Sequence, residues 1–119
     1  MSKIKTTIDY RLDLTVHIAS GDLNSQDILE IFATYYLGKP TTLILWDFTN
    51  ATGSRISDDE LRETAAKAKK HSRIGGKSAL VFSKDIDFRI ARILLELEGH
   101  EHEFVSFRNI EDAERWLGI

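Results

Sequence analysis

The chain has 119 residues, 42% of them hydrophobic and 29% charged, which predicts one folded domain over residues 1–119. Its formal net charge of -3 comes from interspersed acidic and basic residues, so we expect neither nucleic acid nor an anionic lipid surface as a partner. The sequence has no cysteine and no apolar run near the roughly 20 residues of a membrane span, which excludes cysteine-based chemistry and predicts a cytoplasmic protein.

The N-terminal segment alternates apolar and polar residues from Ile4 to Ile18, a pattern typical of a β-strand with one buried face. A straight strand of this length would measure roughly 50 Å at about 3.3 Å per residue, which exceeds the diameter of a small domain. We therefore place a turn near Tyr10 to Asp13 and expect an antiparallel pair of strands.

A first helix is predicted from Asn24, which can act as its N-cap, to about Leu37. Its apolar stripe comprises Ile28, Ile31, Phe32, Tyr35 and Tyr36. Gly38 and Pro40 are expected to end this helix.

The stretch Thr41–Glu60 (TTLILWDFTNATGSRISDDE) contains the expected functional region. Leu43 to Trp46 and then Phe48 leave no polar face, which predicts a central parallel strand covered on both sides. A polar loop is expected after Phe48, at the carboxyl end of the strand, where open α/β sheets bind ligands and partners. The candidate binding residues here are Asp47, Thr49, Asn50, Thr52, Ser54, Arg55 and Ser57.

A second helix should begin at the sequence Ser57-Asp58-Asp59-Glu60, which has the form of a capping box. Its inner side carries Leu61, Ala65 and Ala68, and Gly75 and Gly76 end it. Ala79 to Phe82 is continuously apolar and predicts a second buried strand beside the first.

The third helix, for which Asp85 is the expected N-cap, is unusually apolar between Ile86 and Leu97. This excess indicates either deep burial or a surface for a partner. We predict a homodimer whose contact centres on Phe88, Arg92 and Leu95.

A last strand is predicted at Phe104 to Phe107, followed by a final helix capped by Asn109. The element order is then ββαβαβαβα. This order predicts a single α/β domain with a mostly parallel sheet, helices on its faces and an antiparallel N-terminal pair of strands.

Five segments of the chain carry a resemblance to a known family: ASGDL, LILWDF, ISDDEL, IARILLELEG and FRNIEDAERWL. In these segments the chain resembles the bacterial SpoIIAA-like family of the STAS superfamily, named for sulfate transporters and anti-sigma factor antagonists. The resemblance implies a non-catalytic regulatory module that binds a protein partner through the loop and helix start after the central strand. The alternative is a small-molecule or lipid-binding module that resembles CRAL-TRIO domains.

The resemblance also implies a possible phosphorylation site. Anti-sigma factor antagonists are switched at a serine in an Asp-Ser-Ser/Thr-Gly motif, at the helix start after a central strand, and Ser57 occupies that position. Its neighbours Ile56, Asp58 and Asp59 depart from the motif, and the acidic residues that follow would repel a phosphate. We therefore interpret Ser57 as a structural cap in preference to a phosphosite.

Catalytic and metal-binding patterns are weak. His100 and His102 could chelate a metal, but they supply two ligands and the sequence does not locate a third, so we predict no metal and no cofactor. No Gly-x-Ser-x-Gly nucleophile motif is present, and Asp47 more often holds a following loop than acts as a general base. The sequence therefore does not predict an enzyme.

Overall fold

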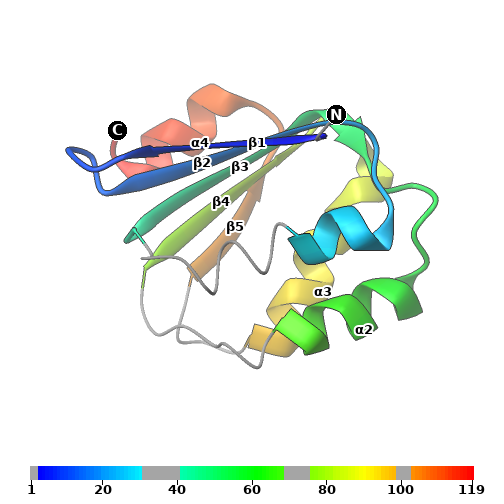
Figure 1. Cartoon of the computed structure of the whole chain (residues 1–119). Coiled ribbons are helices and arrows are strands. Elements are labelled where there is room, and N and C mark those ends of the chain that lie inside the picture. Colours follow the sequence, from blue (N-terminus) through cyan, green and yellow to red (C-terminus); the bar gives the residue numbers. More distant parts are fainter. Residues whose placement is uncertain (1–2, 31–40, 69–75, 99–102) are drawn as a thin grey trace.

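Five strands form one sheet in the computed structural model, which describes residues 3–30, 41–68, 76–98 and 103–119. The strands follow chain order across the sheet, with the bounds Ile4–Asp9 (β1), Leu14–Asp22 (β2), Leu43–Thr52 (β3), Lys77–Phe82 (β4) and Glu103–Phe107 (β5). β1 runs antiparallel to β2, and the other neighbouring pairs are parallel (Figure 1). The predicted α/β class and the antiparallel N-terminal pair are therefore confirmed.

Helices cover both faces of this sheet. Residues 25–30 are helical, and the later helices are α2 (Asp58–Ala68), α3 (Phe88–Glu98) and α4 (Ile110–Leu117). Because β2 to β5 lie in chain order, right-handed crossovers place residues 25–30, α2 and α3 on one face, and α4 lies on the other (Figure 1). No helix in the described ranges is long and apolar enough to cross a membrane. The expected end of the first helix lies outside the described residues, at Gly38 and Pro40.

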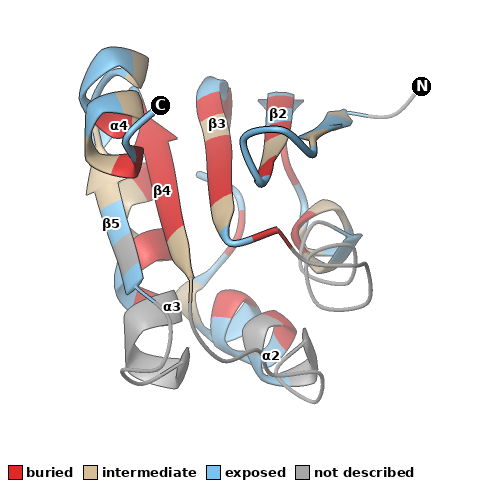
Figure 2. Cartoon of the chain, turned by 90° about the vertical axis from the view of Figure 1, so that its left-hand side faces the viewer, coloured by how far each residue is buried: buried red, intermediate tan, exposed pale blue. Residues whose placement is uncertain are grey.

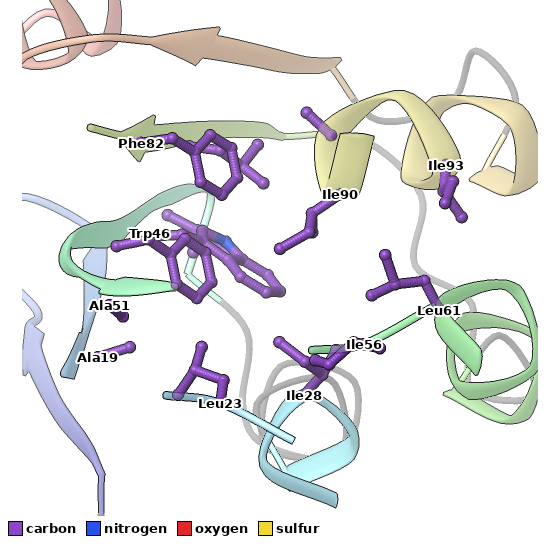
Figure 3. Close-up of a cluster of buried hydrophobic side chains, with 14 residues drawn as sticks. Ala19, Leu23, Ile28, Trp46, Ala51, Ile56, Leu61, Phe82, Ile90 and Ile93 are labelled. Carbon is purple, nitrogen blue, oxygen red and sulfur yellow. The ribbon is translucent and has the colours of Figure 1, made fainter. Parts of the chain in front are cut away.

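The larger core lies between the sheet and the three helices on one face (Figure 3). The rings of Phe48 on β3 and Phe82 on β4 stack with their centroids 5.2 Å apart. Leu61 of α2 and Ile90 of α3 pack against the same cluster. Burial of these side chains is the main favourable contribution to the stability of this layer.

A second, smaller core lies under α4, where Leu45 and Val81 pack against Ala113 and Leu117. With a core on each face, β3 and β4 are buried on both sides, and Figure 2 shows this concentration of buried residues. The continuously apolar sequences of these two strands follow from this double burial, as predicted.

The expected turn between β1 and β2 spans residues 10–13. The carboxylate of Asp9 accepts hydrogen bonds from the backbone N–H groups of Arg11 (3.0 Å) and Leu12 (3.2 Å). Asp13 takes the left-handed backbone conformation, with φ of 53°. An aspartate that bonds the turn backbone thus replaces the Asn-Gly or Asp-Gly sequence that marks many hairpins.

Three helix starts have the side-chain caps that the sequence predicts. Asn24 Oδ1 accepts the backbone N–H of Asp27 at 2.9 Å, and Asn109 Oδ1 accepts that of Asp112 at 2.9 Å. Ser57 forms its capping box with Glu60. These bonds satisfy N–H groups that have no partner within a helix.

The expectation that Asp85 caps the third helix is wrong. Asp85 begins a 3-10 turn, Asp85–Asp87, whose N-cap is Lys84, and no side-chain cap is formed there. The Asp85 carboxylate instead binds the guanidinium of Arg108 at 2.6 Å, so an ion pair from the end of β5 competes with the expected capping role.

Candidate functional site

β3 is longer than expected at the end that carries the candidate residues. Thr49, Asn50 and Thr52 lie within the strand, so the prediction that they form a loop is wrong. Ile18 of β2 pairs with Asp47 of β3, and Ser20 of β2 pairs with Asn50 of β3. Between these two pairs the chain advances by two residues in β2 and by three residues in β3. β3 therefore carries one extra residue, a β-bulge, and the ladder resumes beyond it.

Asp47 holds this bulge, as expected from its position. Its Oδ1 accepts the backbone N–H of Thr49 at 3.0 Å and also the Thr49 hydroxyl. Ser83, just after β4, donates its hydroxyl to the Thr49 carbonyl at 2.8 Å. The carboxylate of Asp47 therefore fixes backbone geometry at the end of the sheet.

Two charged side chains, Asp87 of the 3-10 turn and Arg89 of α3, hold the segment after β3. Asp87 is only 1% exposed, and its Oδ1 accepts the backbone N–H of Gly53 at 2.9 Å and the hydroxyl of Thr52 at 3.2 Å. The guanidinium of Arg89 donates to the carbonyl of Gly53. The N–H of Gly53 is thus bonded to the 3-10 turn and its C=O to α3, an arrangement that we call the Gly53 clamp (Asp87, Arg89, Thr52 and Gly53).

Arg89 extends the clamp to α2. Its Nη1 donates to Asp58 Oδ1 at 3.1 Å, and Arg92 lies 3.8 Å from the other carboxylate oxygen of Asp58. The Arg89 side chain is 15% exposed, so water screens its ion pair less than those of the other arginines in the described ranges. The first residue of α2 and the backbone after β3 are therefore fixed to one side chain of α3.

Close packing also accompanies the clamp at Gly53. A Cβ at this position would lie 3.3 Å from Cδ1 of Ile90 and 3.5 Å from Cδ1 of Ile56. Ile56 and Ile90 are both buried in the larger core. The absence of a side chain allows the Gly53 backbone to approach α3 closely.

The polar side chains around this clamp point into solvent. We call them the β3-end surface, and its exposed residues are Thr49, Asn50, Ser54, Arg55 and Ser57. The side chain of Arg55 is 81% exposed and lies 3.8 Å from Asp22 at the end of β2. Of the predicted residues, Asp47 and Thr52 instead serve the backbone, so the candidate site divides into an exposed layer and a supporting layer.

Ser57 is exposed, and its polar groups are hydrogen-bonded to Glu60 within the chain. Its Oγ accepts the backbone N–H of Glu60 at 3.1 Å and donates to Glu60 Oε1 at 3.2 Å, while its own N–H donates to the same carboxylate at 3.3 Å. This reciprocal arrangement is the predicted capping box. Phosphorylation of Ser57 stays a hypothesis that rests on the family resemblance of the sequence.

Two of the three residues expected at a dimer contact have partners within the chain. The Phe88 ring lies 5.3 Å from that of Phe82 and 4.9 Å from the guanidinium carbon of Arg108. Arg92 pairs with Asp58, and the side chain of Leu95 lies outside the described part of α3. A dimer through this helix stays a prediction.

One histidine lies in the larger core layer. Burial lowers the pKa of His17 to about 4, so its ring is neutral at pH 7. Its Nδ1 lies 2.9 Å from the hydroxyl of Thr6, and its ring meets Trp46 edge-on at 5.4 Å. These contacts give His17 a packing role on the sheet.

The histidine pair that was weighed as a metal site and not predicted to be one, His100 and His102, lies outside the described residues. Within the described ranges, no three His, Asp or Glu side chains lie close enough together to hold a metal ion.

Sequence reasoning missed Asp87 and Arg89. The available signal was a pair of opposite charges two residues apart at the start of an otherwise apolar helix, in DIDFRIARILL. Charged residues are rarely buried without a partner, so such a pair indicates polar groups that arrive from another segment.

No family model matches the sequence, and no curated protein matches it. Among solved structures, the chain is similar to the crystal structure of an uncharacterized protein from the DUF3478 family with a SpoIIAA-like fold from Shewanella loihica PV-4. The TM-score is 0.58 and the sequence identity 19%, and the match covers 96% of this chain and 91% of that chain. The chain therefore has a SpoIIAA-like fold, which confirms at the level of the fold the resemblance found in the sequence.

Proposed function

We propose that this chain is a non-catalytic, regulatory protein-binding module that acts through the β3-end surface and the start of α2. The observation that carries the proposal is the Gly53 clamp beneath that surface. The bonds of the clamp fix the backbone, while the side chains of the β3-end surface are exposed to a partner. A surface that is ordered before binding loses less conformational entropy when the complex forms.

The charged side chains beneath this surface are already bonded to the chain's own backbone, which favours a binding function over a catalytic one. Asp87 and Arg89 bind the backbone of Gly53, and Asp47 binds Thr49. A general acid or base must reach the proton that it transfers, and these groups already hold the chain itself. The SpoIIAA-like fold supports the same class of function by analogy.

Arg55 is the residue with which to test the proposal. Arginine is enriched among residues that dominate binding energy, and the Arg55 side chain is 81% exposed. A matched control lies on α4, where Arg115 is 80% exposed and also has one acidic neighbour, Asp112 at 3.4 Å. Arg55→Glu and Arg115→Glu therefore change the charge equally at two different surfaces.

The experiment is affinity capture with the wild type and both variants, followed by mass spectrometry of bound proteins and small molecules. The expected result is a protein retained by the wild type and by Arg115→Glu, and lost by about tenfold or more with Arg55→Glu. Equal capture by all three proteins would contradict the proposed surface. Copurification of a stoichiometric apolar small molecule, with no protein dependent on Arg55, would favour the ligand-binding alternative.

A further inference from the structure

β1 is an exposed edge strand. It occupies one end of the strand order, and no described element lies outside it (Figure 1). Residues 5–8 are exposed, and Ile8 is 44% exposed. Such a strand presents unpaired backbone groups that can pair with another strand.

The register with β2 determines which backbone groups point outward. Ser20 donates its N–H to the carbonyl of Lys3 at 2.9 Å, so Lys3 and Ser20 form a hydrogen-bonded pair. Because such pairs alternate in an antiparallel ladder, Lys5, Thr7 and Asp9 also direct their backbone groups to β2. The N–H and C=O groups of Thr6 and Ile8 therefore face away from the sheet.

We propose that β1 pairs antiparallel with β1 of a second copy of the chain, across a two-fold axis at Thr7. In this register Thr6 lies opposite Ile8 of the second copy, and their outward N–H and C=O groups bond to each other twice around the axis. The contact would cover part of the exposed Ile8 side chain and extend the sheet from one copy into the other.

Charge favours a second copy as the occupant. The same register places Lys5 opposite Asp9 of the second copy, and the two-fold axis repeats this pair of opposite charges. Lys5 is exposed and makes no ion pair in the described part of the chain. Asp9 uses Oδ1 in the turn, which leaves Oδ2 to meet a lysine. β1 is therefore complementary to itself.

The competing register, centred on Thr6, is less favourable. It would place Lys3 opposite Asp9, but the Lys3 ammonium already donates to the carbonyl of Asp22 at 2.7 Å and to Asp27 at 3.2 Å. Those bonds would have to break before Lys3 could pair across the axis. The register centred on Thr7 needs no such rearrangement.

A disulfide cross-link tests the register directly, because the natural chain has no cysteine. Across the proposed axis, Thr7 and its copy form a non-hydrogen-bonded pair with Cα atoms about 4.5 Å apart, within the range that a disulfide spans. Lys5→Cys is the matched control, because it lies on the same face of β1 and its copy would be about 14 Å away along the strand.

Under mild oxidation with diamide, Thr7→Cys should form a covalent dimer about tenfold faster than Lys5→Cys, because the two thiols are held together. Equal rates for the two variants would overturn the proposed pairing.

Sedimentation velocity over the micromolar range tests the unlinked protein. A contact of this size predicts a dimer that dissociates on dilution. Lys5→Glu should shift the protein to monomer by placing two pairs of like charges across the axis, whereas Lys84→Glu, the same change at an exposed lysine after β4, should not. A wild type that stays monomeric, or a dimer lost with Leu95→Arg and retained with Lys5→Glu, would overturn the proposal.

Discussion

Replacement of Asp87 by alanine should destabilise the protein by removing the buried acceptor of the Gly53 clamp. The carboxylate is 1% exposed and accepts two hydrogen bonds, from the Gly53 N–H at 2.9 Å and the Thr52 hydroxyl at 3.2 Å. Hydrogen bonds to a charged group contribute about 1.5–3 kcal/mol each, and relief of the buried charge offsets part of this loss. We expect Asp87→Ala to lower the free energy of unfolding by about 3 kcal/mol.

The assay is urea denaturation followed by tryptophan fluorescence, because Trp46 is buried in the neighbouring core. Asp87→Asn keeps an oxygen acceptor and should lose about half as much stability. Thr52→Val keeps the carboxylate and removes the Thr52 hydroxyl, which donates to Asp87 and accepts the exposed backbone N–H of Ser54 at 3.2 Å, and should lose about 1 kcal/mol. If Asp87→Ala is as stable as Asp87→Asn, the carboxylate does not hold Gly53 and the clamp is misassigned.

Ser57→Ala should lower the free energy of unfolding by about 1 kcal/mol in urea melts, because the cap of α2 is lost, and an unchanged stability would argue against that cap. The pKa of His17 is lowered by burial from 6.5 to about 4, so unfolded His17 takes up a proton that the folded form excludes. Between pH 6.5 and pH 4 the wild type should therefore lose about 3 kcal/mol of stability relative to His17→Leu, and parallel stability curves for the two proteins would contradict this. Protein purified without a histidine tag should carry no stoichiometric zinc or nickel by elemental analysis, whereas one equivalent that is lost in His100→Ala would reverse this prediction.

The sheet could be predicted because its signals are local. Alternation from Ile4 to Ile18 indicated strands, and the length of that run required a turn. The buried face expected from this alternation is incomplete, because Ile8 is 44% and Ile18 is 42% exposed. The apolar runs Leu43 to Phe48 and Ala79 to Phe82 indicated strands covered on both faces, and the two cores confirm this. Each of these inferences rests on side chains near one another in the sequence.

The extent of β3 could not be predicted from such a pattern. Thr49, Asn50 and Thr52 are polar, and they remain in the strand because their backbone groups pair with β2 after the bulge. Backbone pairing is available to any residue except proline, so the side-chain pattern does not encode where the ladder ends.

The supporting layer of the site depends on contacts between distant segments. Asp87 and Arg89 bond to Gly53 from 34 and 36 positions away in the chain. Their role depends on how closely α3 approaches the end of β3, which local sequence does not specify. The exposed residues of the site, by contrast, follow from the polar sequence after a buried strand.

Hydrogen–deuterium exchange of the protein, alone and with its captured partner, tests the proposed function most directly. The Ser54 and Ser57 amides lie at exposed residues, whereas the Gly53 amide is bonded to buried Asp87 and should exchange slowly in both states. The account predicts that binding slows exchange over residues 54–57 and leaves α4 unchanged. Protection over α4 with none at residues 54–57 would contradict it.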